Sequence, residues 1–421
     1  MVANPGISGS LALQSSSEAL MTLNAAILDP EESTRDATVL AALVLQMHDT
    51  LSAISDGRKA HGIHRDGALA LLLRRDGRSR NQKYHASLAG NLFHSKVSHC
   101  VKNRSSLLPS ELEWLRSQVI PIIPITPSSL LDMIGLSITS LRGSLYDISP
   151  PRLHILRKQC DGLEVELQRW PEGIPHLWWP RKIRMGREMN SPSKIYNGTC
   201  YIYPSLQIAN IWNTWRIYRL VLEELKLQLG DHPEFSSGIP ATHKADVVRD
   251  HDGMTDIVHD ICYSIPFYLG SLTQPRVLSD IEGPGVIFPS YHDLDPSDEG
   301  FLIFSASDYY ASKLDHCRHV ALNGPLHVIN ILSHVISLCS NRASFLRAQD
   351  VQTKWIAEQF LRALYLIIFE DGKNGETTHP QGRTRVLAER QVKQDQVIIG
   401  KLSFGERPHN TAAAPAPEPS T

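Results

Sequence analysis

The sequence predicts an all-α protein, built as a single large stack of antiparallel helices joined by long irregular loops. Two observations predict this class. Apolar residues recur at intervals of three and four positions over most of the chain, which is the spacing of one face of an α-helix. Convincing alternation of apolar and polar residues, the mark of a half-buried strand, is absent. Because each apolar stripe must bury against a neighbour, we expect the helices to share a core.

The predicted helices follow one another along the chain with recognisable ends. Ser33 and Asp36 suit the start of the helix that contains Leu40 to Ile54. Pro150 suits the first turn of the helix that contains Leu153 to Trp170, and Gly230 suits the position after the helix that contains Ile208 to Leu229. We expect the helix that contains Met254 to Ile265 to end at Pro266, because proline breaks a helix. The stripes expected to face the core are Leu40, Leu43, Val44, Met47, Leu51 and Ile54; Leu131, Ile134, Ile138, Leu141 and Leu145; Leu153, Leu156, Cys160, Leu163, Leu167 and Trp170; Ile208, Ile211, Trp212, Trp215, Tyr218, Leu222, Leu225 and Leu229; Met254, Ile257, Val258, Ile261 and Ile265; and Trp355, Ile356, Phe360, Leu364 and Ile367.

The breaks between these stripes predict the loops. Polar turns are expected at 55–58 and 74–83, and long irregular stretches at 171–203, 230–252 and 273–298. Loops of this length in a compact protein are usually functional or mobile. No linker divides the chain, so residues 1–404 are predicted as one helical domain. The Ala/Pro-rich end, residues 405–421, is predicted to be disordered.

The composition excludes several classes of protein. Among 421 residues, 42 Lys and Arg stand against 44 Asp and Glu, a net charge of -2, so the chain is not a globally basic nucleic-acid wrapper. A hydrophobic fraction of 42% is ordinary for a folded protein. No uninterrupted apolar run approaches the roughly 18 residues of a membrane span. The N-terminus lacks the basic and apolar regions of a secretory signal, so secreted and membrane classes are not expected.

The cysteines are too dispersed for a zinc site. The closest two, Cys317 and Cys339, are 22 residues apart, whereas structural zinc sites need pairs separated by two to four residues. In a chain without a secretory signal we expect reduced, buried or half-buried thiols. All six are Cys100, Cys160, Cys200, Cys262, Cys317 and Cys339.

Four His-Asp pairs are the only pattern that favours an enzyme. Some helical phosphohydrolases use adjacent histidine and aspartate to hold divalent cations. The alternative, which we favour, is that each pair caps or pairs locally. The sequence contains no Gly-rich phosphate loop, Gly-x-Ser-x-Gly or His-Glu-x-x-His. We therefore predict no catalytic residue, no metal site and no cofactor, and a protein that is not an enzyme. The pairs are His48-Asp49, His251-Asp252, His259-Asp260 and His292-Asp293.

Two basic clusters could bind nucleic acid or an acidic partner. The second directly follows two tryptophans, Trp178 and Trp179, an arrangement that suits base stacking. The favoured alternative is a solvated loop, and a nuclear import signal is a third reading. The clusters are Arg74, Arg75, Arg78, Arg80 and Lys83, and Arg181, Lys182, Arg184 and Arg187.

Several strings, in order, resemble the large helical regulatory region of fungal zinc-cluster transcription factors. The most specific are Trp212 to Arg216, which reads Trp-Asn-x-x-Arg, and Cys262 to Gly270, which reads Cys-x-Ser-Ile-Pro-x-x-x-Gly. His64 to Ala68 is similar to the family's His-x-x-Gly-Ala element. The other matches, which extend over about residues 2–370, are Asn4-Pro5, Leu11 to Leu13, Val44 to Asp49, Arg74 to Gly77, Leu92-Phe93, Arg104, Leu108-Pro109, Glu113 to Leu115, Leu163 to Trp170, Trp178 to Pro180, Ala209 to Ile211, Gly324 to Leu326 and Trp355-Ile356.

The resemblance implies a nuclear transcription regulator, which would respond to a small-molecule effector and contact the transcription machinery or another regulator. The family's zinc cluster needs six cysteines within roughly thirty residues, and this chain has none, so direct sequence-specific DNA binding is not expected. The alternative function is a helical metabolite-binding or protein-interaction scaffold, located in the cytoplasm and unrelated to transcription. The oligomeric state is left open.

Overall fold

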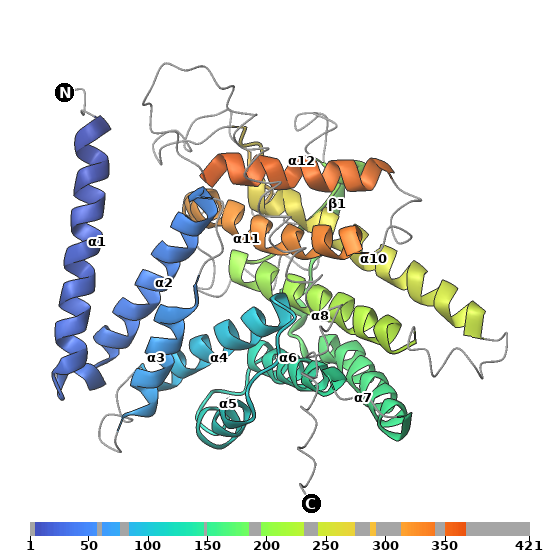
Figure 1. The fold of residues 1–421 in the computed structure, drawn as a ribbon. Helices are drawn as coiled ribbons and strands as arrows, with labels where there is room; N and C mark the ends of the chain where they lie inside the picture. The colour runs from blue at the N-terminus through green and yellow to red at the C-terminus, as the bar shows by residue number, and fades with distance from the viewer. Residues whose placement is uncertain are drawn as a thin grey trace, which may run out of the picture.

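The computed structural model describes residues 5–56, 61–75, 84–146, 150–184, 195–230, 243–273, 287–291, 313–341 and 350–367. The predicted all-α class is confirmed over these residues, because helices make up nearly all of the regular structure and the strands form a single two-stranded sheet. Figure 1 shows the helices packed side by side in one body. The predicted tail, 405–421, lies outside the described residues.

The elements follow the order that the periodicity predicted, with additions. Single turns of 3-10 helix connect several of them. A short π-helix, η3, extends α5. Their bounds are α1 Pro5–Leu28, α2 Asp36–Asp56, α3 Ile63–Leu73, α4 His85–Lys102, α5 Pro109–Trp114, η3 Leu115–Val119, α6 Pro127–Gly143, α7 Pro150–Arg169, β1 Arg181–Arg184, β2 Thr199–Ile202, α8 Leu206–Gly230, α10 His243–Leu269, α11 Lys313–Asn341 and α12 Asp350–Ile367.

Helix α8 is the centre of the fold. It contacts α6 and α7 on one side and α10 and α11 on the other, and α12 covers α11. At the blue edge of Figure 1, α2 and α3 pack beside α4, and α1 lies beyond α2. One continuous hydrophobic core runs through these helices. The stripe Leu153 to Trp170 of α7 is buried throughout, as its spacing predicted.

The stretch 171–203, predicted as irregular, contains two paired strands. β1 and β2 run antiparallel with Arg181 opposite Ile202 and Arg184 opposite Thr199. β2 packs on α10 and is buried at Cys200 and Ile202. Each strand has only four residues, so neither carries enough alternation for a period of two to be read from the sequence.

Helix α10 is longer than predicted at both ends. It begins at His243, within the segment expected to be a loop, and continues through Pro266 to Leu269. A proline inside a helix costs one hydrogen bond, and tertiary packing can offset that loss. The helix ends where Gly270 adopts a φ of 51°, a left-handed conformation that glycine reaches without strain.

The predicted core stripe of α2 is wrong at three of its six positions, whereas Ile54 is buried and Leu43 and Leu51 are half-buried. Leu40, Val44 and Met47 are 53%, 60% and 47% exposed. Instead, Val39 and Ala42 turn inward and are buried. The helix is apolar on two sides, so its periodicity alone could not decide which side meets the core. The structure therefore leaves an exposed row of apolar side chains along α2.

Two helices are long and apolar enough to cross a membrane by length and composition alone. They are Asp36–Ile54 of α2, with a mean hydropathy of 1.4, and Lys313–Leu338 of α11, with a mean hydropathy of 1.2. Isolated polar residues interrupt both helices, so neither contains an uninterrupted apolar run of the length of a membrane span. In α11, 61% of the apolar window is buried inside the fold, as in a core helix of a soluble protein, but only 28% of the α2 window is buried.

Gly324 sets the separation of α10 and α11. A Cβ at this position would lie 2.0 Å from the carbonyl oxygen of Tyr268, which is backbone and cannot rotate away. We expect Gly324→Ala to lower the free energy of unfolding by about 1–3 kcal/mol through overpacking. Gly253→Ala is the control, because its Cβ meets no atom within 4 Å and should stabilise α10 by about 0.5–1 kcal/mol. Urea unfolding distinguishes the two, and equal changes would contradict the close approach.

Candidate functional site

The two most specific strings of the sequence resemblance meet inside the protein. Asn213 of α8 makes the hydrogen bonds that connect them. Its Oδ1 atom accepts hydrogen bonds from Ser264 Oγ at 3.1 Å and Arg216 Nη1 at 3.0 Å. Its Nδ2 atom donates to Tyr268 Oη at 2.9 Å. All four residues are buried, so these bonds tie α8 to α10 in a low-dielectric interior where they are strong.

Two tyrosines contact the charged guanidinium of Arg216 at this junction. Its guanidinium is buried, donates to Tyr203 Oη at 2.8 Å and lies 5.2 Å from the ring centre of Tyr201. Tyr201 Oη in turn donates to Asp260 at 2.8 Å. Burial raises the pKa of Tyr203, despite the nearby guanidinium charge. Both tyrosines therefore stay neutral near pH 7, and the cluster serves to hold α8, α10 and β2 together.

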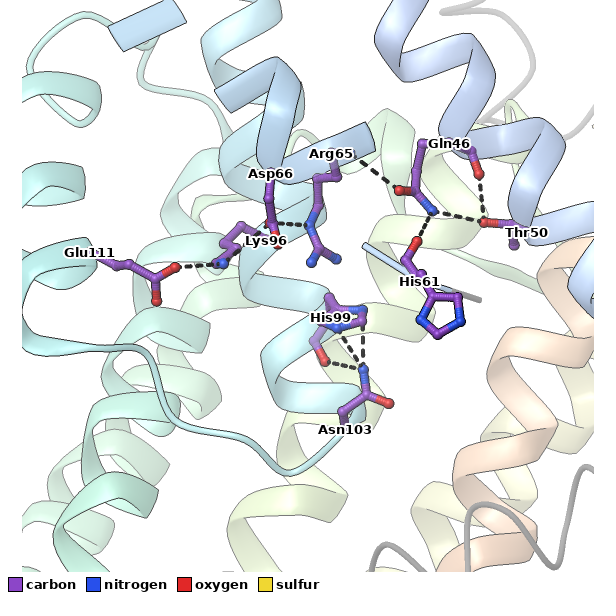
Figure 2. A network of polar contacts seen from close by, with 9 residues as sticks. All are labelled: Gln46, Thr50, His61, Arg65, Asp66, Lys96, His99, Asn103 and Glu111. Carbon is purple, nitrogen blue, oxygen red and sulfur yellow. Dashed lines mark hydrogen bonds and ion pairs between the residues drawn. The ribbon is translucent and has the colours of Figure 1, made fainter. Parts of the chain in front are cut away.

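A second polar network lies at the α2–α3–α4 edge and is drawn in Figure 2. Gln46 of α2 accepts a hydrogen bond from the backbone N–H of Arg65 at 3.2 Å and donates to the carbonyl of His61 at 2.9 Å. Asp49 accepts from the backbone N–H of His61 at 3.0 Å. Through these bonds, α2 fixes the start of α3.

Charged side chains from three helices continue this network. Lys96 of α4 donates to Asp66 at 3.3 Å and to Glu111 at 2.8 Å. Burial disfavours its charge, but the bond to Glu111 and the charge of Asp66 raise the Lys96 pKa above its usual value. Burial acts against ionised Glu111 as well, yet the Lys96 bond and the backbone N–H of Leu108 lower its pKa. The pair therefore remains ionised at neutral pH.

Arg65 is the member of the network with unused donors. Its side chain is only 7% exposed, and its Nε donates to Asp66 Oδ1 at 3.2 Å. Neither Nη nitrogen has a hydrogen-bond partner among the described residues. In Figure 2 both lie on the side of the guanidinium that faces away from Asp66. Arg65 is not among the residues with a fully buried unpaired nitrogen, so its Nη groups reach the surface, where a guanidinium edge with two available donor groups is suited to bind an acceptor.

An apolar cleft lies at the C-terminal end of α3. Its walls come from α3, α4 and the π-helix η3, and π-helical turns are frequent at functional sites. The indole N–H of Trp114 is buried there without a hydrogen-bond partner. The cleft is lined by Leu72, Leu73, His85, Ala89, Trp114, Gln118, Val119 and Ile122.

The His-Asp pairs are not brought together in the described part of the chain. Asp49 anchors the backbone of His61, while His48 is exposed. Asp260 accepts from Tyr201, and the ring of His259 lies 5.6 Å from that of Tyr196. No group of three metal-ligating side chains occurs among the described residues. The side chains of His251-Asp252 and the whole of His292-Asp293 lie outside them.

The cysteines with described side chains are free thiols, four of them buried and Cys317 half-buried, as predicted. The Cys339 side chain lies outside the described residues. Burial raises the pKa of Cys160 to about 12, so this thiol is un-ionised at neutral pH.

The basic clusters are only partly described. Arg75 is buried and donates to Asp36 at 2.8 Å, so it belongs to the core. Arg181, Lys182 and Arg184 form β1 in place of the expected loop. The positions outside the described residues are Arg78, Arg80, Lys83 and Arg187.

Comparison of the chain with protein-family models, with curated proteins and with solved structures gives no match. The resemblance to the fungal regulatory region therefore depends on the sequence strings alone. One string, His64 to Ala68, contains Arg65, but sequence reasoning assigned it no role. The unused donors arise from tertiary burial, which a single string does not reveal.

Proposed function

We propose that this chain is the helical regulatory region of a fungal zinc-cluster type transcription regulator, without a DNA-binding module of its own. One observation carries the proposal. The two most specific strings of the resemblance are hydrogen-bonded to each other through Asn213 and Ser264, which are 51 positions apart. This contact supports the proposal by placing the two strings in one buried junction of α8 and α10, and the assignment to the family itself comes from the sequence resemblance.

The proposed mode of action is binding rather than catalysis. A small-molecule effector that binds two arrangements of the helices unequally shifts their populations, and a few kcal/mol of differential affinity are enough. The shifted arrangement would expose or cover a surface for the transcription machinery or another regulator. Nuclear localisation belongs to the same proposal. With a net charge of -2, we propose no sequence-specific contact with DNA.

The test is a reporter assay in fungal cells. The full chain is fused to a heterologous DNA-binding module, and transcription from its target promoter is compared with that of the module alone. We expect the fusion to change transcription, upward or downward. Trp212→Ala, which is expected to destabilise the core, should abolish the change. A folded, nuclear fusion that leaves transcription unchanged would contradict the proposal.

The exposed apolar row of α2 favours a second candidate, a protein-interaction scaffold that pairs with a second copy of this chain. Leu40, Val44 and Met47 are spaced by four and three residues, as in a helix-pairing seam. The helix carries no charged side chain between Asp36 and Asp49, so two identical faces can meet without like-charge repulsion. An unpaired row of this kind is typical of an interface.

We expect this chain to self-associate at micromolar concentration and Val44→Glu to shift it toward the monomer. The reason is that a carboxylate at the centre of two identical faces would be buried beside its own copy. Sedimentation equilibrium measures the shift. Leu322→Glu is the control, because Leu322 is 61% exposed on α11, away from the seam. A wild-type chain that stays monomeric contradicts this candidate, and so does association that Val44→Glu leaves unchanged.

A further inference from the structure

We propose that the N-terminus of α3, together with Arg65, binds an oxyanion group of a small molecule, a carboxylate or a phosphate. Neither the sequence resemblance nor the comparisons assign a ligand to this place. The site does not depend on the proposed role in transcription, because its geometry concerns binding only. If that role holds, the site is a candidate for the effector.

The start of α3 presents unsatisfied positive character. Gly62 is the N-cap and supplies no side-chain cap. Gln46 caps only the amide of Arg65, and the amide of Asp66 bonds to the carbonyl of Gly62. The first-turn amides of Ile63 and His64 have no acceptor within the helix. Such an end, with the positive pole of the helix dipole, attracts anions.

The guanidinium of Arg65 folds back onto this same helix end. A Cβ on Gly62 would lie 2.3 Å from Arg65 Nη2 and 3.5 Å from Nη1. The guanidinium can therefore occupy this position only because Gly62 has no side chain. A cation against the positive end of a helix is electrostatically unfavourable by itself. An anion that contacted both would relieve this repulsion, which the bond to Asp66 alone does only in part.

The unused edge of the guanidinium defines the ligand class. Its Nε edge is taken by Asp66, and its two Nη groups, which have no hydrogen-bond partner in the part of the chain that the structure describes, present a fork of donors. Such a fork matches the two oxygens of a carboxylate or phosphate. Because the side chain is 7% exposed, its charge is weakly screened, and an ion bound there would be held more firmly than at the surface.

None of the described carboxylates near this helix end bonds to an Nη group of Arg65. Of the carboxylates, Asp66 binds Arg65 Nε and Lys96, Glu111 binds Lys96, and Asp49 binds the amide of His61. In each of these contacts the donor is Arg65 Nε, Lys96 or the amide of His61, and none of them uses an Nη group of Arg65.

The experiment is calorimetric titration of the full chain with inorganic phosphate and, separately, with succinate, each at constant ionic strength. Sodium chloride is the non-oxyanion control. We expect one saturable site for at least one oxyanion. Arg65→Gln should weaken binding at least tenfold, because it removes the charged fork. Arg35→Gln is the matched control, since Arg35 is an exposed arginine already paired with Glu31 and Glu32, and should bind as wild type.

Gly62→Ala keeps the test decisive if Arg65→Gln fails to fold. It preserves every charge, and its Cβ displaces the flexible end of Arg65 from the helix end. We expect a loss of binding of at least tenfold with circular dichroism unchanged. Phosphate binding without succinate binding assigns a phosphorylated ligand, and the reverse assigns a carboxylate. No saturable binding of either oxyanion by the wild type, or equal binding by wild type and both site variants, would overturn the proposal.

Discussion

Replacement of Trp212 by alanine is expected to lower the free energy of unfolding by about 3–5 kcal/mol. Trp212 lies on α8, the central helix, and is only 4% exposed. Its indole N–H donates to the carbonyl of Trp178 at 2.7 Å, so the substitution also leaves that carbonyl without its donor. Because a typical domain has 5–15 kcal/mol of stability in total, the variant should be close to the limit of folding.

The cost of losing Trp212 is large because the ring is the centre of a tryptophan cluster. Trp170, Trp179 and Trp215 lie 5.4, 5.7 and 5.5 Å from it, each in an edge-to-face arrangement. Such pairs contribute roughly 0.5–1.5 kcal/mol beyond the area that they bury. The cluster joins α8 to the segment after α7. The segment 262–270 meets α8 elsewhere, through the bonds of Asn213 to Ser264 and Tyr268.

Denaturant unfolding of three variants measures this effect. Trp179→Ala is the control, because Trp179 is 40% exposed and its loss should cost clearly less. Trp215→Ala should be intermediate, since this half-buried ring also donates to the carbonyl of Leu167 at 2.8 Å. If Trp212→Ala unfolds at the same denaturant concentration as Trp179→Ala, the tryptophan cluster is not central to the fold.

The sequence predicted the helices best where one face alone is apolar. The stripe Leu153 to Trp170 has mostly polar residues on its other sides, with only Ile155 and Val165 as large exposed apolar exceptions, so its spacing identified the buried face correctly. Helix α2 is apolar on two sides, and only contacts with α3 and α4 decide which side is covered. Pro266 shows the opposite error. A local rule ended the helix there, but packing against α8 and β2 carries it on to Leu269.

Candidate functional residues were harder to predict than helices. His64 to Ala68 stood out as a string, yet nothing in the string says that Arg65 is buried with unused donors. That property requires Gly62 beneath the guanidinium, Gln46 from another helix and Asp66 on one edge only. These are contacts between helices, and periodicity within one helix carries no information about them. The His-Asp pairs show the reverse, since a visible pattern has no common role where it is described: Asp49 accepts from the amide of His61, and Asp260 of α10 accepts from Tyr201 of β2.

Replacement of Glu224 by alanine is the second change with a large expected effect, also about 3–5 kcal/mol of unfolding free energy. Glu224 of α8 is 5% exposed and accepts hydrogen bonds from two buried arginines. Arg104 Nε lies 3.0 Å from both carboxylate oxygens, and Arg142 Nη2 lies 3.2 Å from Oε2. Without the Glu224 carboxylate, the guanidinium groups of Arg104 and Arg142 would remain buried and would lose their shared negative partner.

The backbone of Arg104 indicates how much this contact contributes. Its φ of 51° is left-handed, a conformation that costs a residue with a Cβ roughly 1–2 kcal/mol and that glycine adopts freely. It occupies the position after the α4 C-cap, where its amide bonds to Val101 and that of Ser105 to Cys100, a place where glycine is the usual residue. An arginine there is explained by its side chain, which reaches Glu224 and Ser337.

Comparison of Glu224→Ala with Arg104→Gly separates the ion pair from the backbone. Arg104→Gly removes one guanidinium, relieves the left-handed strain and leaves Glu224 paired with Arg142, so it should cost clearly less than Glu224→Ala. Glu164→Ala is the surface control. Glu164 is 37% exposed and pairs with Lys226, and its loss should cost no more than about 1 kcal/mol. Urea unfolding orders the three variants, and a Glu224→Ala cost no greater than that of Glu164→Ala would mean that the buried arginines find other acceptors.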